Sequence, residues 1–185
     1  MRKIIVSNMV TLDGYIEGPN RELDWHVLND EFLKYAEDML NAADVLLFGR
    51  VTYEMMAAYW TLPESIKNDA VIAGKMNSLP KIVFSKTLDK VEWENTSLIK
   101  ENIKGEMLKL KGQPGKDIVI LGSASIVSAF TQMGIIDEYR ILINPVILGA
   151  GNLQFRGNIN KTLLRLTDLK KLNSGVVILY YQPIQ

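Results

Sequence analysis

The feature that most constrains the fold is an alternation of two hydrophobic periods along the chain. Short apolar runs rich in β-branched residues have the composition of strands, and they occupy residues 4–10, 45–48, 82–84, 118–121, 138–143, 163–169 and 176–181. Apolar stripes at helical spacing lie between the first five runs, at residues 32–40, 53–60, 66–76, 103–110 and 126–133. Strands that alternate with helices predict right-handed crossovers, and therefore a largely parallel sheet covered on both faces.

The carboxyl-terminal third has a different pattern. The segment "KKLNSGVVILYY" carries a turn signal, Asn173-Ser174-Gly175, between two strand-like runs, which predicts an antiparallel hairpin. The chain has no repeat or long linker, and the stretch Gly105–Lys116 is interpreted as a helix end followed by a loop. We therefore expect a single α/β domain over residues 1–185, with a central mixed, mostly parallel sheet and a terminal hairpin.

Composition narrows the classes of partner and compartment. Basic and acidic residues are equal in number, 21 each, so no overall field favours nucleic acid or an anionic membrane. No apolar window approaches the roughly 18 residues of a membrane span, and the amino terminus is a poor signal peptide because its short apolar run soon reaches Asp13. The absence of cysteine fits a reducing compartment. We expect a cytoplasmic protein in which any charge-driven binding is local.

Three predicted strand ends carry residues suited to anions. In a parallel sheet these ends share one edge, and here they are followed by Gly49–Thr52, Ser85–Thr87 and Gly122–Ser125. Helices that start there present free N–H groups and a partial positive charge, and Arg50 and Lys86 add full charges. Each residue alone also fits an ordinary turn, helix cap or solvated surface charge. Their convergence on one edge favours a phosphate-binding site.

Several other chemistries are disfavoured. His26 is the single histidine and the chain has no cysteine. A zinc site would therefore lack ligands, thiol catalysis would lack its nucleophile, and a serine nucleophile would have only His26 as a base. No metal site is expected. The segment "GAGNLQF" contains Gly-x-Gly but lacks the third glycine of a dinucleotide fingerprint, and no triphosphatase phosphate loop occurs.

An ordered set of segments resembles a known family over nearly the whole chain. The segments are "VTLDGYIEGP", "LLFGRVTYE", "IVFSKTL", "IVILGSASIVSAF" and "DEYRILINPVILGAG". They resemble the dihydrofolate reductase superfamily, and within it the reductase domain of the bacterial riboflavin-biosynthesis deaminase-reductase. The resemblance implies a dihydrofolate reductase-like fold, NADPH as hydride donor and a homodimer.

The resemblance also assigns the cofactor-binding residues. Those that match the family's phosphate-binding turns are Gly49, Arg50, Thr52, Gly122, Ser123 and Ala124. Ser85 and Lys86 match positions near the 2′-phosphate of the adenosine ribose. Because positive side chains interact most strongly with that additional phosphate, NADPH is preferred to NADH.

Three further residues are assigned to the reaction centre by the resemblance. Asp13 matches an acidic residue near the nicotinamide and the substrate, where a carboxyl group can deliver a proton or orient the reactants. Its Asp-Gly context also fits a simple turn. Trp25 resembles an active-site tryptophan, and Glu31, or alternatively Asp30, lies near the position of the folate reductases' substrate-binding carboxylate. A packing role for Trp25 and a helix-start role for the carboxylates remain alternatives.

The sequence therefore predicts a reductase of the 5-amino-6-(5-phosphoribosylamino)uracil reductase type that transfers hydride to a small heterocyclic or conjugated substrate. Because no zinc deaminase domain is found in the sequence, the resemblance implies the reductase step alone. A true dihydrofolate reductase and a non-catalytic nucleotide-binding protein of the same fold are the two alternatives.

Overall fold

The computed structural model describes residues 1–157 and 160–184. The helices are α1 (Asp30–Ala42), α2 (Arg50–Trp60), α3 (Pro63–Asn68), α4 (Ala70–Ser78), α5 (Ile103–Lys111) and α6 (Ala124–Met133). The strands are β1 (Ile4–Thr11), β2 (Tyr15–Glu17), β3 (Ala43–Gly49), β4 (Lys81–Phe84), β5 (Thr96–Ile99), β6 (Asp117–Leu121), β7 (Glu138–Asn144), β8 (Asn152–Leu153), β9 (Leu164–Lys171) and β10 (Val177–Pro183).

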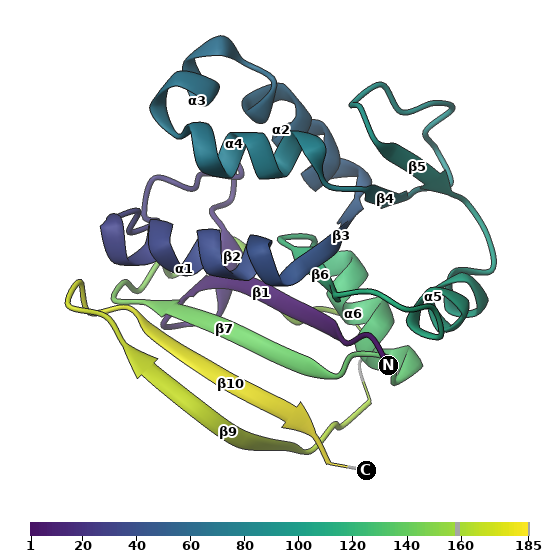
Figure 1. The fold of residues 1–185 in the computed structure, drawn as a ribbon. Coiled ribbons are helices and arrows are strands. Elements are labelled where there is room, and N and C mark those ends of the chain that lie inside the picture. Colours follow the sequence, from purple (N-terminus) through teal and green to yellow (C-terminus); the bar gives the residue numbers. More distant parts are fainter. Residues whose placement is uncertain (158–159, 185) are drawn as a thin grey trace.

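An eight-stranded sheet in the order β5-β4-β3-β6-β1-β7-β10-β9 forms the centre of the molecule (Figure 1). Every neighbouring pair from β5 to β7 in this order is parallel, whereas β10 pairs antiparallel with both β7 and β9. The turn between β9 and β10 lies at the predicted Asn173–Gly175, where Gly175 has a positive φ of 89°. The predicted mixed sheet and terminal hairpin are confirmed.

Alternate strand residues pack against different helices. In β1, Ile4 and Val6 join the core formed with α5 and α6, whereas Ile5 joins the core formed with α1, α2 and α4. In β3, Leu47 and Leu46 divide in the same way between the two faces. Because side chains alternate along a strand, continuous apolar runs are what a sheet covered on both faces requires.

The structure differs from the predicted elements in two respects. The apolar stripe over residues 66–76 forms two helices, α3 and α4, because Asp69 interrupts it and accepts a hydrogen bond from the Ile72 N–H as the cap of α4. The strands β2, β5 and β8 were not predicted. β2 and β8 form a separate two-stranded sheet, called here the strap.

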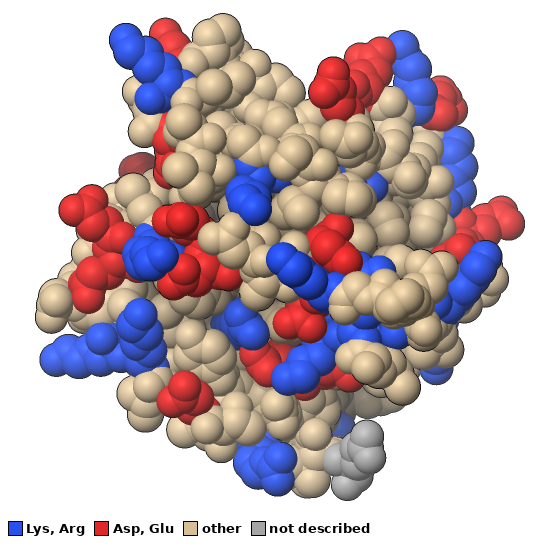
Figure 2. Space-filling model, viewed as in Figure 1, with Lys and Arg blue, Asp and Glu red and all other residues tan. Residues whose placement is uncertain are grey.

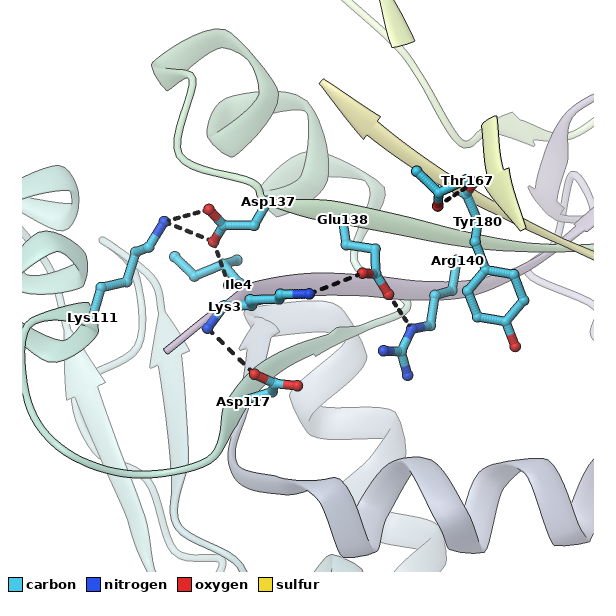
Figure 3. Close-up of polar contacts among 9 residues, drawn as sticks. All are labelled: Lys3, Ile4, Lys111, Asp117, Asp137, Glu138, Arg140, Thr167 and Tyr180. Atoms are coloured by element: carbon cyan, nitrogen blue, oxygen red, sulfur yellow. Dashed lines mark hydrogen bonds and ion pairs between the residues drawn. The ribbon is translucent and has the colours of Figure 1, made fainter. Parts of the chain in front are cut away.

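Charged groups tie together the amino ends of the parallel strands (Figure 3). Asp137 accepts hydrogen bonds from the Ile4 N–H at 2.7 Å and from Lys111 Nζ at 2.9 Å. Glu138 accepts a bond from Arg140 Nε at 2.7 Å and lies 3.5 Å from Lys3 Nζ. These contacts fix the register of β1 and β7 and leave the opposite, carboxyl edge of the sheet for the loops.

Basic and acidic residues are equal in number, and their side chains are interleaved rather than separated into patches over the face that Figure 2 presents. Within the described residues, no helix is both long and apolar enough to cross a bilayer.

Candidate active site

A cavity of about 360 Å³ lies at the carboxyl ends of β3 and β6, between the starts of α2 and α6. Its lining comes from both helix starts, from the end of β4 and from the strap: Ile16, Glu17, Arg21, Gly49, Arg50, Val51, Thr52, Phe84, Ser123, Ala124, Ser125, Asn152 and Arg156. The helix after β3 covers one face of the sheet and the helix after β6 covers the other. Crevices at such positions are the ligand sites of open α/β sheets.

Both helices that begin at the cavity lack a side-chain cap. Gly49 precedes α2 and has no side chain that could cap it, and Ser123 precedes α6 without accepting a hydrogen bond from the first turn of that helix. The first N–H groups of each helix are therefore available to a ligand, together with the positive end of the helix dipole. This pairing of helix starts is suited to an anion with more than one phosphate group.

Two reciprocal hydrogen bonds join these helix starts. Ser123 Oγ accepts a bond from the Gly49 N–H at 2.6 Å, and Thr52 Oγ1 accepts one from the Ser123 N–H at 3.1 Å. We call this pair of bonds the latch. Each hydroxyl keeps its own proton for donation, so the latch leaves Thr52 and Ser123 able to contact a phosphate.

The glycines at the cavity are required by space and by backbone geometry. A Cβ atom on Gly122 would lie 3.0 Å from Thr52 Cγ2, at a residue whose φ is +62°. A Cβ atom on Gly49 would lie 3.1 Å from Ile126 Cγ1 and 3.2 Å from Ser123 Oγ. A side chain at either position would therefore crowd the contact between the helix starts, and at Gly122 it would also strain the backbone.

Three arginines and one carboxylate line the cavity. Arg50 extends from the first turn of α2, with Nη1 3.7 Å from Glu54. Arg21 and Arg156 follow the two strands of the strap, and none of the ion pairs among the described residues includes either of them. The Glu17 carboxylate accepts a bond from Asn152 Nδ2 at 2.8 Å. The cavity therefore carries a net positive charge.

Sequence reasoning missed Arg21 and Arg156. Neither follows a strand of the main sheet, and both reach the cavity because β2 pairs with β8 across more than 130 residues of chain, from Tyr15 to Leu153. No local pattern in the sequence signals that pairing.

The structure gathers only part of the predicted cofactor site. Gly49, Arg50, Thr52, Ser123 and Ala124 line the cavity, and Gly122 directly precedes Ser123.

Ser85 and Lys86 do not line the cavity. Ser85 Oγ accepts bonds from the Thr87 and Leu88 N–H groups, both at 3.1 Å, and so closes a turn, while Lys86 is exposed. The loop after them lines a separate cavity of about 400 Å³. The end of β4 reaches the site through Phe84 instead.

Asp13 lies in the turn after β1, outside the cavity lining, with its carboxylate fully engaged. It accepts hydrogen bonds from Thr11 Oγ1 at 2.6 Å, from the Gly149 N–H at 2.8 Å and from the Leu148 N–H at 3.1 Å. The Thr11 hydroxyl, followed by the two backbone donors, lowers the pKa of Asp13 to about 2. This side chain is a carboxylate at neutral pH and joins the turn after β1 to the loop after β7.

The predicted substrate-binding residues also lie outside the cavity lining. Glu31, in the first turn of α1, accepts bonds from Asn173 in the hairpin turn, at 2.7 Å from the backbone N–H. Its neighbour Asp30 is exposed. Trp25 donates its ring N–H to the Glu22 carbonyl at 3.2 Å and packs edge-on against His26, with ring centroids 4.4 Å apart. Burial lowers the pKa of His26 to about 4, which keeps the ring neutral.

Comparisons with known proteins agree with this architecture. A sequence profile described as the RibD C-terminal domain matches residues 2–178. The uncharacterized protein YyaP of Bacillus subtilis is 35% identical over 180 residues, which is 97% of this chain and 94% of that protein.

Two solved structures share the fold. A putative riboflavin biosynthesis protein from Shewanella sp. PV-4 superimposes with a TM-score of 0.78 at 20% identity, over 99% of both chains. A dihydrofolate reductase from Enterococcus faecalis, complexed with NADP(H) and RAB-propyl, gives a TM-score of 0.67 at 14% identity, over 99% of this chain and 97% of that one. With the fold, the profile match and the identity to YyaP in agreement, this chain belongs to the RibD C-terminal domain family.

Proposed function

We propose that this protein is an NADPH-dependent reductase of the 5-amino-6-(5-phosphoribosylamino)uracil reductase type, which transfers hydride to a small heterocyclic or conjugated substrate. The observation that carries the proposal is the cavity in which two uncapped helix starts meet three arginines. Membership in a family of reductase-like domains supports the same chemistry.

The residues at the cavity fit the phosphates of a dinucleotide. The starts of α2 and α6 provide N–H donors for a diphosphate, and Thr52 and Ser123 provide hydroxyl protons from the two sides of the latch. Arg50, Arg21 and Arg156 supply charge for the diphosphate and for a 2′-phosphate. When bound, the nicotinamide supplies the hydride, and the protein supplies position and electrostatics.

Asp13 lies outside the cavity lining, and it supports this reaction by holding a loop in place rather than by delivering a proton. A carboxyl group with a pKa of about 2 carries no proton to donate near neutral pH. Its bonds to the Leu148 and Gly149 N–H groups hold the loop after β7 beside the carboxyl end of β1. The proton that balances the hydride transfer is accordingly assigned to solvent.

A titration and a turnover assay test the proposal. NADPH fluorescence should change on binding. Arg50→Ala should lower the affinity for NADPH more than the affinity for NADH, since only NADPH has the 2′-phosphate. NADPH oxidation in the presence of pyrimidine, pterin and dihydrofolate substrates then identifies the reaction. Binding without turnover of any of them would favour a non-catalytic nucleotide-binding protein, and turnover of dihydrofolate would favour a folate reductase.

We propose further that the protein forms a homodimer through the hairpin end of the sheet. On the sheet face shared with α6, Leu166 lies opposite Tyr181 and Leu169 lies opposite Leu179. Leu166 is 46% exposed and Leu169 is 56% exposed, so this end of the face is apolar and uncovered. A second copy that packs there would remove this surface from water.

A further inference from the structure

Two buried amide side chains at the carboxyl end of the sheet are bonded to each other. Asn8 belongs to β1, and Gln154 directly follows β8 of the strap; they are 2% and 1% exposed. Asn8 Nδ2 donates to Gln154 Oε1 at 2.7 Å and to the Gly122 carbonyl at 2.8 Å. Because this nitrogen faces two acceptors, a flip of either amide would bring like atoms together, so the orientation of both is fixed.

The other half of each amide has no partner. Asn8 Oδ1 and Gln154 Nε2 are buried and lack a hydrogen bond among the described residues. Two facing amides can form two hydrogen bonds, and here one is made and the other is missing. A buried polar atom without a partner destabilises a fold, so two of them in one contact require an explanation.

The pair lies directly beside the proposed cofactor cavity. Gly122, whose carbonyl Asn8 holds, precedes the cavity residue Ser123, and the cavity residues Asn152 and Arg156 flank Gln154. In the sheet, β4 lies on one side of the β3–β6 crevice and β1 lies on the other. The pair therefore lies on the β1 side of this crevice, opposite β4.

The two free atoms define the group that they would recognise. Asn8 Oδ1 is an acceptor and Gln154 Nε2 is a donor, so their complement is an N–H beside a C=O. We infer that Asn8 and Gln154 form a recognition site for an amide edge, which a ligand reaches when the Gln154 side chain turns toward the cavity. The carboxamide of nicotinamide has such an edge, and so does the lactam of a pyrimidine substrate. This inference rests on the proposed reductase function.

The test compares NADPH with an analogue altered at this edge and with a fragment that lacks it. NADPH, its 3-acetylpyridine analogue, which has a methyl ketone in place of the carboxamide, and adenosine 2′,5′-bisphosphate, which lacks the nicotinamide, are titrated against the wild type, Gln154→Met and Gln154→Glu. Gln154→Glu keeps an acceptor for Asn8, but it replaces the free donor with an acceptor and adds a negative charge, so it should weaken NADPH binding at least as much as Gln154→Met. Exposed Gln132 on α6 gives a matched control, Gln132→Met. Thermal unfolding confirms that each variant is folded.

If the pair recognises nicotinamide, the wild type prefers NADPH to the analogue by about tenfold, the worth of one well-made buried hydrogen bond. Gln154→Met then loses about tenfold in NADPH affinity and keeps its affinity for the bisphosphate, whereas Gln132→Met changes neither. If the pair recognises the substrate, NADPH affinity is unchanged and the Gln154 variants lose binding of uracil in the presence of NADPH. Unchanged binding of both NADPH and uracil overturns the inference. Failure of the wild type to bind both the bisphosphate and NADPH overturns the proposed function itself.

Discussion

The latch between the helix starts makes a quantitative prediction for Ser123→Ala. The substitution removes the acceptor of the Gly49 N–H, a bond of 2.6 Å between two buried residues, and leaves that N–H without a partner. Such a loss costs about 1–3 kcal/mol in the free energy of unfolding. For a chain of this size, each kcal/mol lowers Tm by about 2–4 °C. Urea unfolding followed by circular dichroism measures the loss directly.

The neighbouring Ser125→Ala is the matched control, since Ser125 is an exposed serine in the same helical turn. It should change the free energy of unfolding by less than about 0.5 kcal/mol. Thr52→Val removes the second bond of the latch, and the double variant should lose less than the sum of the two single losses, because both bonds hold the same two turns. Equal destabilisation by Ser123→Ala and Ser125→Ala, or strict additivity with Thr52→Val, would refute the latch.

Three further predictions concern stability and assembly. Asp13→Asn should reduce the loss of stability at acid pH. The pKa of Asp13 is lowered from 3.8 to about 2 in the fold, so its stabilisation is present above about pH 4 and is lost as the pH falls toward 2. Urea midpoints at neutral and acid pH that shift equally in the variant and the wild type would contradict this. Lys81→Met should lower the free energy of unfolding by about 2–4 kcal/mol. The buried Lys81 ammonium donates to three carbonyls at and just after the end of α4, those of Met76, Asn77 and Leu79. The control Lys86→Met replaces an exposed lysine and should have little effect on the same urea curves. The wild type should have the mass of the proposed dimer in light scattering and Leu169→Arg that of a monomer, and equal masses would exclude this face as the interface.

The main sheet could be predicted because its signal is local. Runs such as Val45–Phe48 are apolar on both faces, and only a strand covered on both sides needs that composition. The strand β5 was missed because it is short and half polar, and β2 and β8 contain too few residues to show a period. We predicted one helical segment where the structure has α3 and α4, because the spacing of apolar residues gives no sign that Asp69 caps a new helix.

The candidate site could be predicted only where a strand leads directly into it. Arg50 and Ser123 were found because the carboxyl ends of parallel strands must share an edge. The same rule wrongly placed Ser85 and Lys86 in the cofactor site, because it gives no information about the local turn that the Ser85 hydroxyl closes. Arg156 and Gln154 depend on the strap, a long-range pairing of very short strands that sequence periodicity cannot detect.

The most direct test of the central claim is the affinity for NADPH of the double variant Arg21→Gln/Arg156→Gln. If the cavity binds the phosphates of the dinucleotide, loss of these two charge-assisted contacts should raise the Kd at least about tenfold, while Lys90→Gln in the separate cavity leaves it unchanged. A Kd that is the same in the wild type, the double variant and Lys90→Gln would show that the dinucleotide does not bind there.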